Sequence, residues 1–161
     1  MTLNVYLASR YSRYEEMQGY AAQLVEVGCS VMSRWIQGDH QMSDRKVTDE
    51  AEQLERIRFA EEDVLDLRAA SVVINFTEQP RATNTRGGRH VEFGMALAMG
   101  KKLVVVGHRE NVFHCLPEVA YFPVWEGALD HVRMMAYRQE IAHIPHRPPS
   151  ERGVQTRGDV L

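Results

Sequence analysis

The chain has 161 residues, of which 44% are hydrophobic and 25% are charged, as expected for one globular domain that buries a core without disulfides or a structural metal. Its 19 Lys and Arg residues against 22 Asp and Glu residues give a formal net charge of −3. This balance argues against nucleic acid or an anionic membrane as a partner, because both attract basic surfaces.

Apolar runs such as 103–107 are too short to span a bilayer, and the first residues lack a basic segment followed by an apolar core. We therefore expect a cytoplasmic protein. Cys29 and Cys115 are isolated, which predicts two buried free thiols. The seven histidines show no metal-ligand spacing, so we predict neither a metal nor a cofactor.

Hydrophobic patterning divides the chain into alternating strands and helices. In chain order it predicts a strand at 3–8, a helix at 14–27, a strand at 30–36, a polar loop or lid at 37–49, a helix at 50–70, a strand at 71–76, a helix at 90–99, strands at 102–107 and 121–125, and a helix at 127–144. This order is typical of a doubly wound α/β fold, flavodoxin-like or Rossmann-like, with a five-stranded, mainly parallel sheet and helices on both faces. We predict one domain at 1–144 and a Pro-rich, mobile tail at 145–161.

Ligands of such sheets bind at the carboxyl ends of the strands. After the first strand the loop contains Ser9, Arg10 and Arg13, whose hydroxyl and guanidinium groups suit an anion such as a phosphate. A helix cap with two solvated arginines is an equally good interpretation. The chain contains neither a dinucleotide-binding glycine motif nor a P-loop.

Two acidic residues are the candidates for chemistry. Glu92 follows a glycine-rich turn in the first turn of its predicted helix, where the helix dipole should keep it ionised. Asp63 lies on the long helix at 50–70, among other acids. Taken alone, a capping glutamate and a solvated helix face would explain them.

In order and spacing these features resemble the nucleoside 2-deoxyribosyltransferase family and its sister branch, the nucleoside 5′-monophosphate N-glycosidases. The resemblance rests on Tyr6 in the first strand, on Asp63 before the strand at 71–76, and on the sequence His-Val-Glu-Phe-Gly at 90–94. An Ala-rich helix that ends in Gly-Lys follows at 95–102. The match covers roughly residues 3 to 107.

The resemblance implies that Glu92 is a nucleophile that forms a glycosyl ester, that Asp63 is the acid/base, and that Tyr6 orients Glu92. The substrate-binding residues that we expect are Ser9, Arg10, Arg13, Trp35, Gly87, Gly88, Arg89 and His90. Trp35 would form a flat wall for the base, although a core position is as good an interpretation.

The expected partner is a small-molecule nucleoside or nucleotide. Three functions remain open: transfer of a deoxyribosyl group from a 2′-deoxynucleoside or its 5′-monophosphate to another base, hydrolysis of nucleoside 5′-monophosphates, and nucleotide sensing without turnover. The resemblance also implies a homodimer or a larger even-numbered homo-oligomer whose pockets are completed by a neighbouring subunit.

Overall fold

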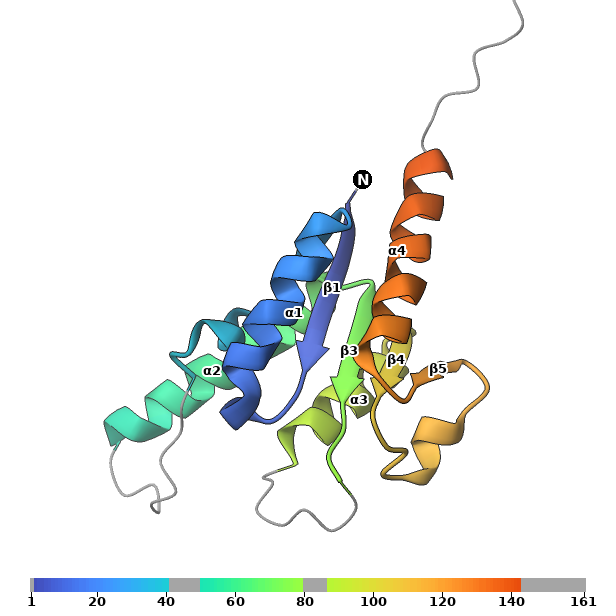
Figure 1. The fold of residues 1–161 in the computed structure, drawn as a ribbon. Coiled ribbons are helices and arrows are strands. Elements are labelled where there is room, and N and C mark those ends of the chain that lie inside the picture. The colour runs from blue at the N-terminus through green and yellow to red at the C-terminus, as the bar shows by residue number, and fades with distance from the viewer. Residues whose placement is uncertain (1, 41–49, 80–86, 143–161) are drawn as a thin grey trace, which may run out of the picture.

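The computed structural model describes residues 2–40, 50–79 and 87–142, and within them five strands form one sheet in the order β2-β1-β3-β4-β5 (Figure 1). The strands are β1 (Leu3–Ala8), β2 (Cys29–Val31), β3 (Val72–Phe76), β4 (Lys102–Val106) and β5 (Val119–Phe122). All four neighbouring pairs are parallel. The predicted doubly wound fold is therefore confirmed.

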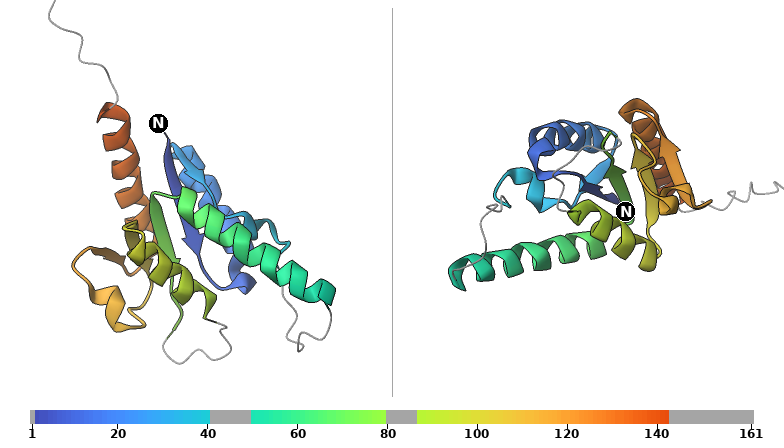
Figure 2. Two further views of the ribbon diagram at one scale, coloured as in Figure 1. Left: turned by 180° about the vertical axis from the view of Figure 1, so that it is seen from behind. Right: turned by 90° about the horizontal axis from the view of Figure 1, so that it is seen from below.

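Four helices cover the two faces of the sheet (Figures 1 and 2). They are α1 (Tyr14–Glu26), α2 (Glu50–Ala69), α3 (Gly88–Ala98) and α4 (Trp125–Ala142). On one face lie α1 and α4, and on the other lie α2 and α3. Every residue of β3 is buried, as the near-continuous apolar run at this strand predicts.

Aromatic side chains join α1 and α4 over the middle of the sheet. The Tyr20 ring on α1 stacks on Trp125 of α4 at 4.4 Å and on Phe76 of β3 at 5.3 Å between ring centroids. The Trp125 indole also donates a hydrogen bond to the Gln23 side chain at 2.9 Å. These contacts hold the first and last helices together across about a hundred residues of sequence.

The strand order places the chain reversal between β1 and β3. Tyr6 is in register with Val73, and Ala8 with Asn75, so the carboxyl ends of both strands lie side by side. The chain leaves β1 towards α1 on one face and leaves β3 towards α3 on the other. This divergence creates the edge at which parallel sheets bind ligands.

The second predicted strand is shorter than expected, because β2 ends at Val31 and Arg34–Gln37 form a 3₁₀ helix, η2. The strand ends early because side chains that follow it make the hydrogen bonds to β1 that the backbone of a longer β2 would make. The Leu7 amide donates to the Ser33 hydroxyl at 2.6 Å, and the Trp35 indole donates to the Leu7 carbonyl at 2.8 Å. The end of β1 is thus satisfied by side chains, which periodicity does not reveal.

Other boundaries move by a few residues. The helix predicted from His90 begins at Gly88, so Glu92 lies beyond its first turn. Cys29 is buried as predicted, but the prediction for Cys115 is wrong, because it is exposed at the end of the 3₁₀ helix η3 (Val112–Cys115).

Residues 41–49 of the predicted lid and the tail at 145–161 lie outside the described residues. Among the helices that are described, none is long and apolar enough to cross a membrane.

Candidate active site

The structure brings Tyr6 and Glu92 into direct contact. Tyr6 is buried in β1, and its hydroxyl donates a hydrogen bond of 2.8 Å to Glu92 Oε1 on α3. The hydroxyl also lies close enough to Asp63 on α2 to stabilise its carboxylate. One phenol therefore connects two acids that come from different helices on the same face of the sheet.

Both carboxyl groups bind protons more tightly than ordinary side chains do. Burial, and then the Asp63 charge, raise the pKa of Glu92 to about 8, against opposing effects of the Tyr6 hydrogen bond and of Arg89. Burial also raises the pKa of Asp63 to about 6. The expectation that the helix dipole keeps Glu92 ionised is wrong, because the residue lies beyond the first turn and loses its solvent.

Asp63 is not part of a solvated acidic face. Its Oδ1 atom is buried and has no hydrogen-bond partner among the described residues. Neighbouring acids on α2 do have partners, since Asp66 is buried and accepts from Arg34 Nε at 2.8 Å. An unpartnered buried carboxyl oxygen beside a second carboxyl is typical of a site that completes its hydrogen bonds with a ligand.

His40 is a neighbour of Asp63 that the sequence did not single out. Its buried ring stacks on Phe59 at 4.4 Å, with ring nitrogens 2.8 Å from Asp39 Oδ1 and 3.1 Å from Glu62 Oε2. When this ring is protonated, its charge opposes the rise in the pKa of Asp63. It lies in a polar segment with no periodicity, so no pattern predicted its burial.

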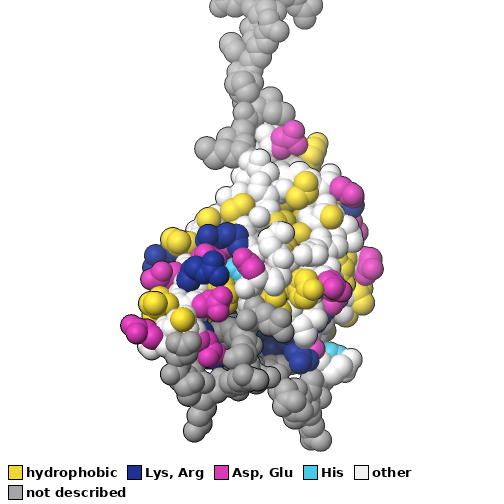
Figure 3. Space-filling view, turned by 90° about the vertical axis from the view of Figure 1, so that its left-hand side faces the viewer, with side chains coloured by type: hydrophobic (Ala, Val, Ile, Leu, Met, Phe, Trp, Pro, Cys, Tyr) yellow, Lys and Arg dark blue, Asp and Glu magenta, His cyan; other side chains and the backbone are white. Residues whose placement is uncertain are grey.

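The outer surface around α2 is charged but balanced. On the face seen in Figure 3, Lys and Arg side chains stand beside Asp and Glu side chains. Arg58 lies 4.0 Å from Glu62, and Arg34 lies 2.8 Å from Asp66. A paired surface of this kind offers no continuous basic stripe.

A third acid, Glu110, organises the other side of the site. Arg89, buried at the start of α3, donates from Nη2 to Glu110 Oε1 at 2.7 Å. His90 Nε2 lies 3.9 Å from Glu110 Oε2. The fully buried His114 accepts from the Glu110 backbone amide at 3.3 Å. Arg89 is therefore held by an internal partner, while its charge still reaches Glu92.

Glu110 and His114 were not named from the sequence, although their loop follows the fourth strand at the predicted ligand-binding edge. Another unpredicted residue is Asn75, which lies in β3 with both amide atoms buried and unpartnered within the described chain. A polar residue inside an apolar strand was the available signal for Asn75.

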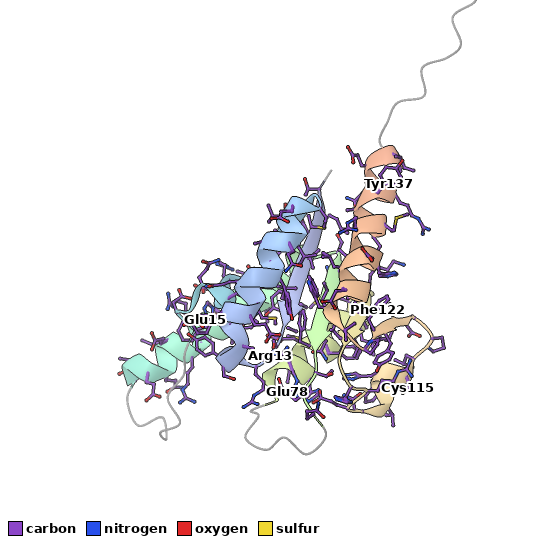
Figure 4. All side chains as sticks on the ribbon, in the orientation of Figure 1. Arg13, Glu15, Glu78, Cys115, Phe122 and Tyr137 are labelled. Carbon is purple, nitrogen blue, oxygen red and sulfur yellow. The ribbon has the colours of Figure 1, made fainter. Side chains whose placement is uncertain are left out.

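The predicted anion-binding residues come together at the end of β1. Arg10 Nη1 lies 3.6 Å and Arg13 Nη1 3.3 Å from the Glu78 carboxylate in the loop after β3. Figure 4 labels Arg13 and Glu78 in this region. The Ser9 hydroxyl oxygen is buried without a hydrogen-bond partner in the described ranges.

The remaining predicted residues have distinct settings. Trp35 is 5% exposed and donates to the backbone of β1, which favours the core interpretation over a wall for the base. Gly87 precedes α3 with a φ of +79°, a conformation that side chains disfavour. Gly88 is the first residue of α3. Contact of these residues with substrate stays a prediction.

The described chain contains no group of three side chains that could hold a metal ion. The expectation that the protein uses no metal rests on the sequence.

Comparison with known proteins adds one informative similarity. No protein-family model and no curated protein sequence matches the chain. Among solved structures, the CMP N-glycosidase BcmB of Clostridium botulinum is similar, with a TM-score of 0.53 and 20% sequence identity. The similarity covers 81% of this chain and 98% of BcmB. At this identity it establishes the shared α/β fold.

Proposed function

We propose that this protein cleaves the N-glycosidic bond of nucleosides or their 5′-monophosphates through a glycosyl ester on Glu92. The observation that carries the proposal is the hydrogen bond from Tyr6 to Glu92, with Asp63 as the second carboxyl that this hydroxyl reaches. Most enzymes that cleave glycosidic bonds use a pair of carboxyl groups in one site. The fold shared with a CMP N-glycosidase supports the same chemistry.

In the first step a Glu92 carboxylate oxygen bonds to C1′ of the sugar. The C1′–N bond breaks, its electron pair passes to the base, and Asp63 supplies a proton to the departing nitrogen. In the second step the Asp63 carboxylate takes a proton from the attacking group, which bonds to C1′ and releases Glu92. Two displacements at C1′ retain its configuration.

The pKa values define the charge state that this mechanism needs. Between about pH 6 and 8 the pair of Asp63 and Glu92 carries one proton, and the higher pKa of Glu92 places it there when the site is empty. The reaction requires the proton on Asp63 instead. Positive charge that develops at C1′ in the transition state stabilises the Glu92 carboxylate, so the approach to the transition state favours this exchange.

The attacking group decides between two reactions. Water gives hydrolysis, and the N-glycosidase activity of BcmB supports this reaction for the present chain as well. A second base gives deoxyribosyl transfer, which the sequence resemblance implies. Chromatography of 2′-deoxynucleosides, ribonucleosides and their 5′-monophosphates, incubated with and without a second base, separates these outcomes. Binding with no release of base would leave only a sensing function.

The covalent step has its own test. Protein quenched during turnover should gain the mass of one glycosyl unit, and peptide mapping should place it on Glu92. The Glu92→Gln variant should bind substrate without gaining this mass. An adduct on another residue, or normal turnover by the variant, would disprove the proposed nucleophile.

A further inference from the structure

The two arginines at the end of β1 are already neutralised within the chain. Arg13 makes a pair of hydrogen bonds to Glu16, at 2.6 and 2.8 Å. Its remaining Nη1 donates to the Thr77 carbonyl and to Glu78, each at 3.3 Å. Arg10 lies 3.6 Å from the other Glu78 oxygen. Two positive and two negative charges therefore cancel at the place where the sequence predicts a phosphate.

Glu78 and Glu16 occupy different positions around the arginines. The Glu78 side chain is 15% exposed and lies between Arg10 and Arg13. The Glu16 side chain is 39% exposed, binds Nε and Nη2 of Arg13, and accepts a hydrogen bond from Tyr20. A carboxylate that bridges two guanidinium groups occupies the position in which an oxyanion of a ligand would bind.

Glu78 is also tied to the active site. Its backbone amide donates to Glu110 Oε1 at 3.1 Å, and the same oxygen accepts from Arg89. Arg89 in turn acts electrostatically on Glu92. These contacts connect the Glu78 backbone, through Glu110 and Arg89, to the carboxyl group of Glu92.

We propose that Glu78 is a specificity-determining residue that occupies the anion position between Arg10 and Arg13 and competes with the 5′-phosphate of a substrate. A 5′-hydroxyl can be bound while Glu78 remains in place. A phosphate must displace it, after which the two arginines and Glu16 leave one net positive charge. Glu78 therefore reduces the preference for nucleoside 5′-monophosphates over nucleosides. This inference rests on the proposed function, but its anion-binding part can be tested without turnover.

The first test measures binding of inorganic phosphate by calorimetry. Glu78→Gln keeps the shape of the side chain and removes its charge, so we expect phosphate to bind about tenfold more tightly than to the wild type. Adding Arg10→Ala to this variant should abolish the gain. The control is Glu15→Gln, which changes the net charge equally at the other side of the start of α1 (Figure 4), where Glu15 accepts a hydrogen bond from Tyr14. Equal phosphate affinity in Glu78→Gln and the wild type would overturn the inference.

The second test compares kcat/KM for a nucleoside and its 5′-monophosphate. In Glu78→Gln the ratio of kcat/KM for the monophosphate to kcat/KM for the nucleoside should rise about tenfold. Glu78→Asp, whose shorter side chain reaches the arginines less well, should give a smaller rise and serves if the first variant does not fold. A tighter phosphate site in a protein that cleaves neither substrate would refute the glycosidase function alone. Cleavage with an unchanged ratio and unchanged phosphate affinity would refute the role of Glu78 alone.

Discussion

Tyr6 and Glu92 are in direct contact, and in the proposed mechanism turnover depends on the protonation state of the Glu92 carboxyl group. A nucleophilic carboxylate must be ionised, while its partner must hold a proton for the leaving base. Burial works against the first requirement, because it raises the pKa of Glu92 to about 8. The Tyr6 hydroxyl partly offsets this cost by donating to the carboxylate.

The pH dependence of kcat/KM should follow this pair. Below about pH 6 both Asp63 and Glu92 become protonated and no nucleophile remains. Above about pH 8 both are ionised and no acid remains. We expect a bell-shaped profile with limbs near these values. For substrates whose base leaves without protonation, Asp63→Asn should remove the fall in kcat/KM at high pH. If that fall persists with such substrates, another group causes it.

The same burial predicts a stability cost for Glu92. Its pKa in the folded state is raised above the unfolded value, so the folded state loses stability as the pH rises from about 4.5 towards 8. Glu92→Gln has no charge to bury. It should therefore be more stable than the wild type at pH 8, by up to about 4 kcal/mol.

Chemical denaturation at two pH values tests this expectation. At pH 5 the wild-type Glu92 is already neutral, so the difference between the two proteins should nearly vanish. A variant that is less stable than the wild type at pH 8 would show that the Tyr6 to Glu92 hydrogen bond outweighs the cost of burying the charge.

At the scale of elements, α3 delivers Glu92 to the site, and two adjacent glycines set its start. Gly87 has a φ of +79°, whereas Gly88 has an ordinary helical position with open space around it. Gly87→Ala should destabilise the fold by about 1 kcal/mol and misplace Glu92. Gly88→Ala should stabilise it by a few tenths to 1 kcal/mol, since alanine restricts the unfolded chain.

The two variants add the same methyl group at adjacent positions, so each is the control for the other. The midpoint temperature of thermal unfolding and kcat/KM should both decrease in Gly87→Ala. In Gly88→Ala both should stay the same or increase. Equal effects would mean that the start of α3 adapts to either side chain.

Elements with a regular hydrophobic pattern were predictable from the sequence, because the buried face of a helix or strand imposes that pattern. Strand β1 begins and ends where the apolar run does, and α2 differs from its prediction by one residue. The end of β2 was not predictable, because the Ser33 hydroxyl substitutes for a backbone partner. The local sequence pattern does not reveal a hydrogen bond between residues so far apart in the chain.

The site shows the same division. The contact between Tyr6 and Glu92 was expected from the family resemblance, which rests on the order and spacing of the motifs that hold the two residues. The carboxylate of Glu78 between the arginines could not be predicted, since it depends on how a loop after β3 packs against a loop after β1. Contacts between loops leave no periodic pattern in the sequence.

At the scale of the whole molecule, α4 is a candidate for self-association. Met134, Tyr137 and Ile141 are 48%, 56% and 45% exposed, and their spacing of three and four residues places them on one stripe of the helix. Tyr137 is labelled near the end of α4 in Figure 4. Exposed apolar stripes of this kind mark contact surfaces.

We expect light scattering at micromolar concentration to report at least twice the mass of one chain. Met134→Glu combined with Tyr137→Glu should lower that mass to a single chain if α4 forms the interface. Val25→Glu on α1, where the side chain is 60% exposed, is the matched control and should leave the mass unchanged. A wild-type mass of one chain would refute the expected assembly.

The stacking of Tyr20 on Trp125 has a consequence for synthesis on the ribosome. Strand β1 emerges first but lies inside the sheet, and the face that carries Phe76 is fully covered only when α4 packs beside α1. A nascent chain that stops before residue 125 therefore leaves the aromatic side chains of Tyr20 and Phe76 partly uncovered and open to a chaperone. The domain closes only after α4 has left the exit tunnel.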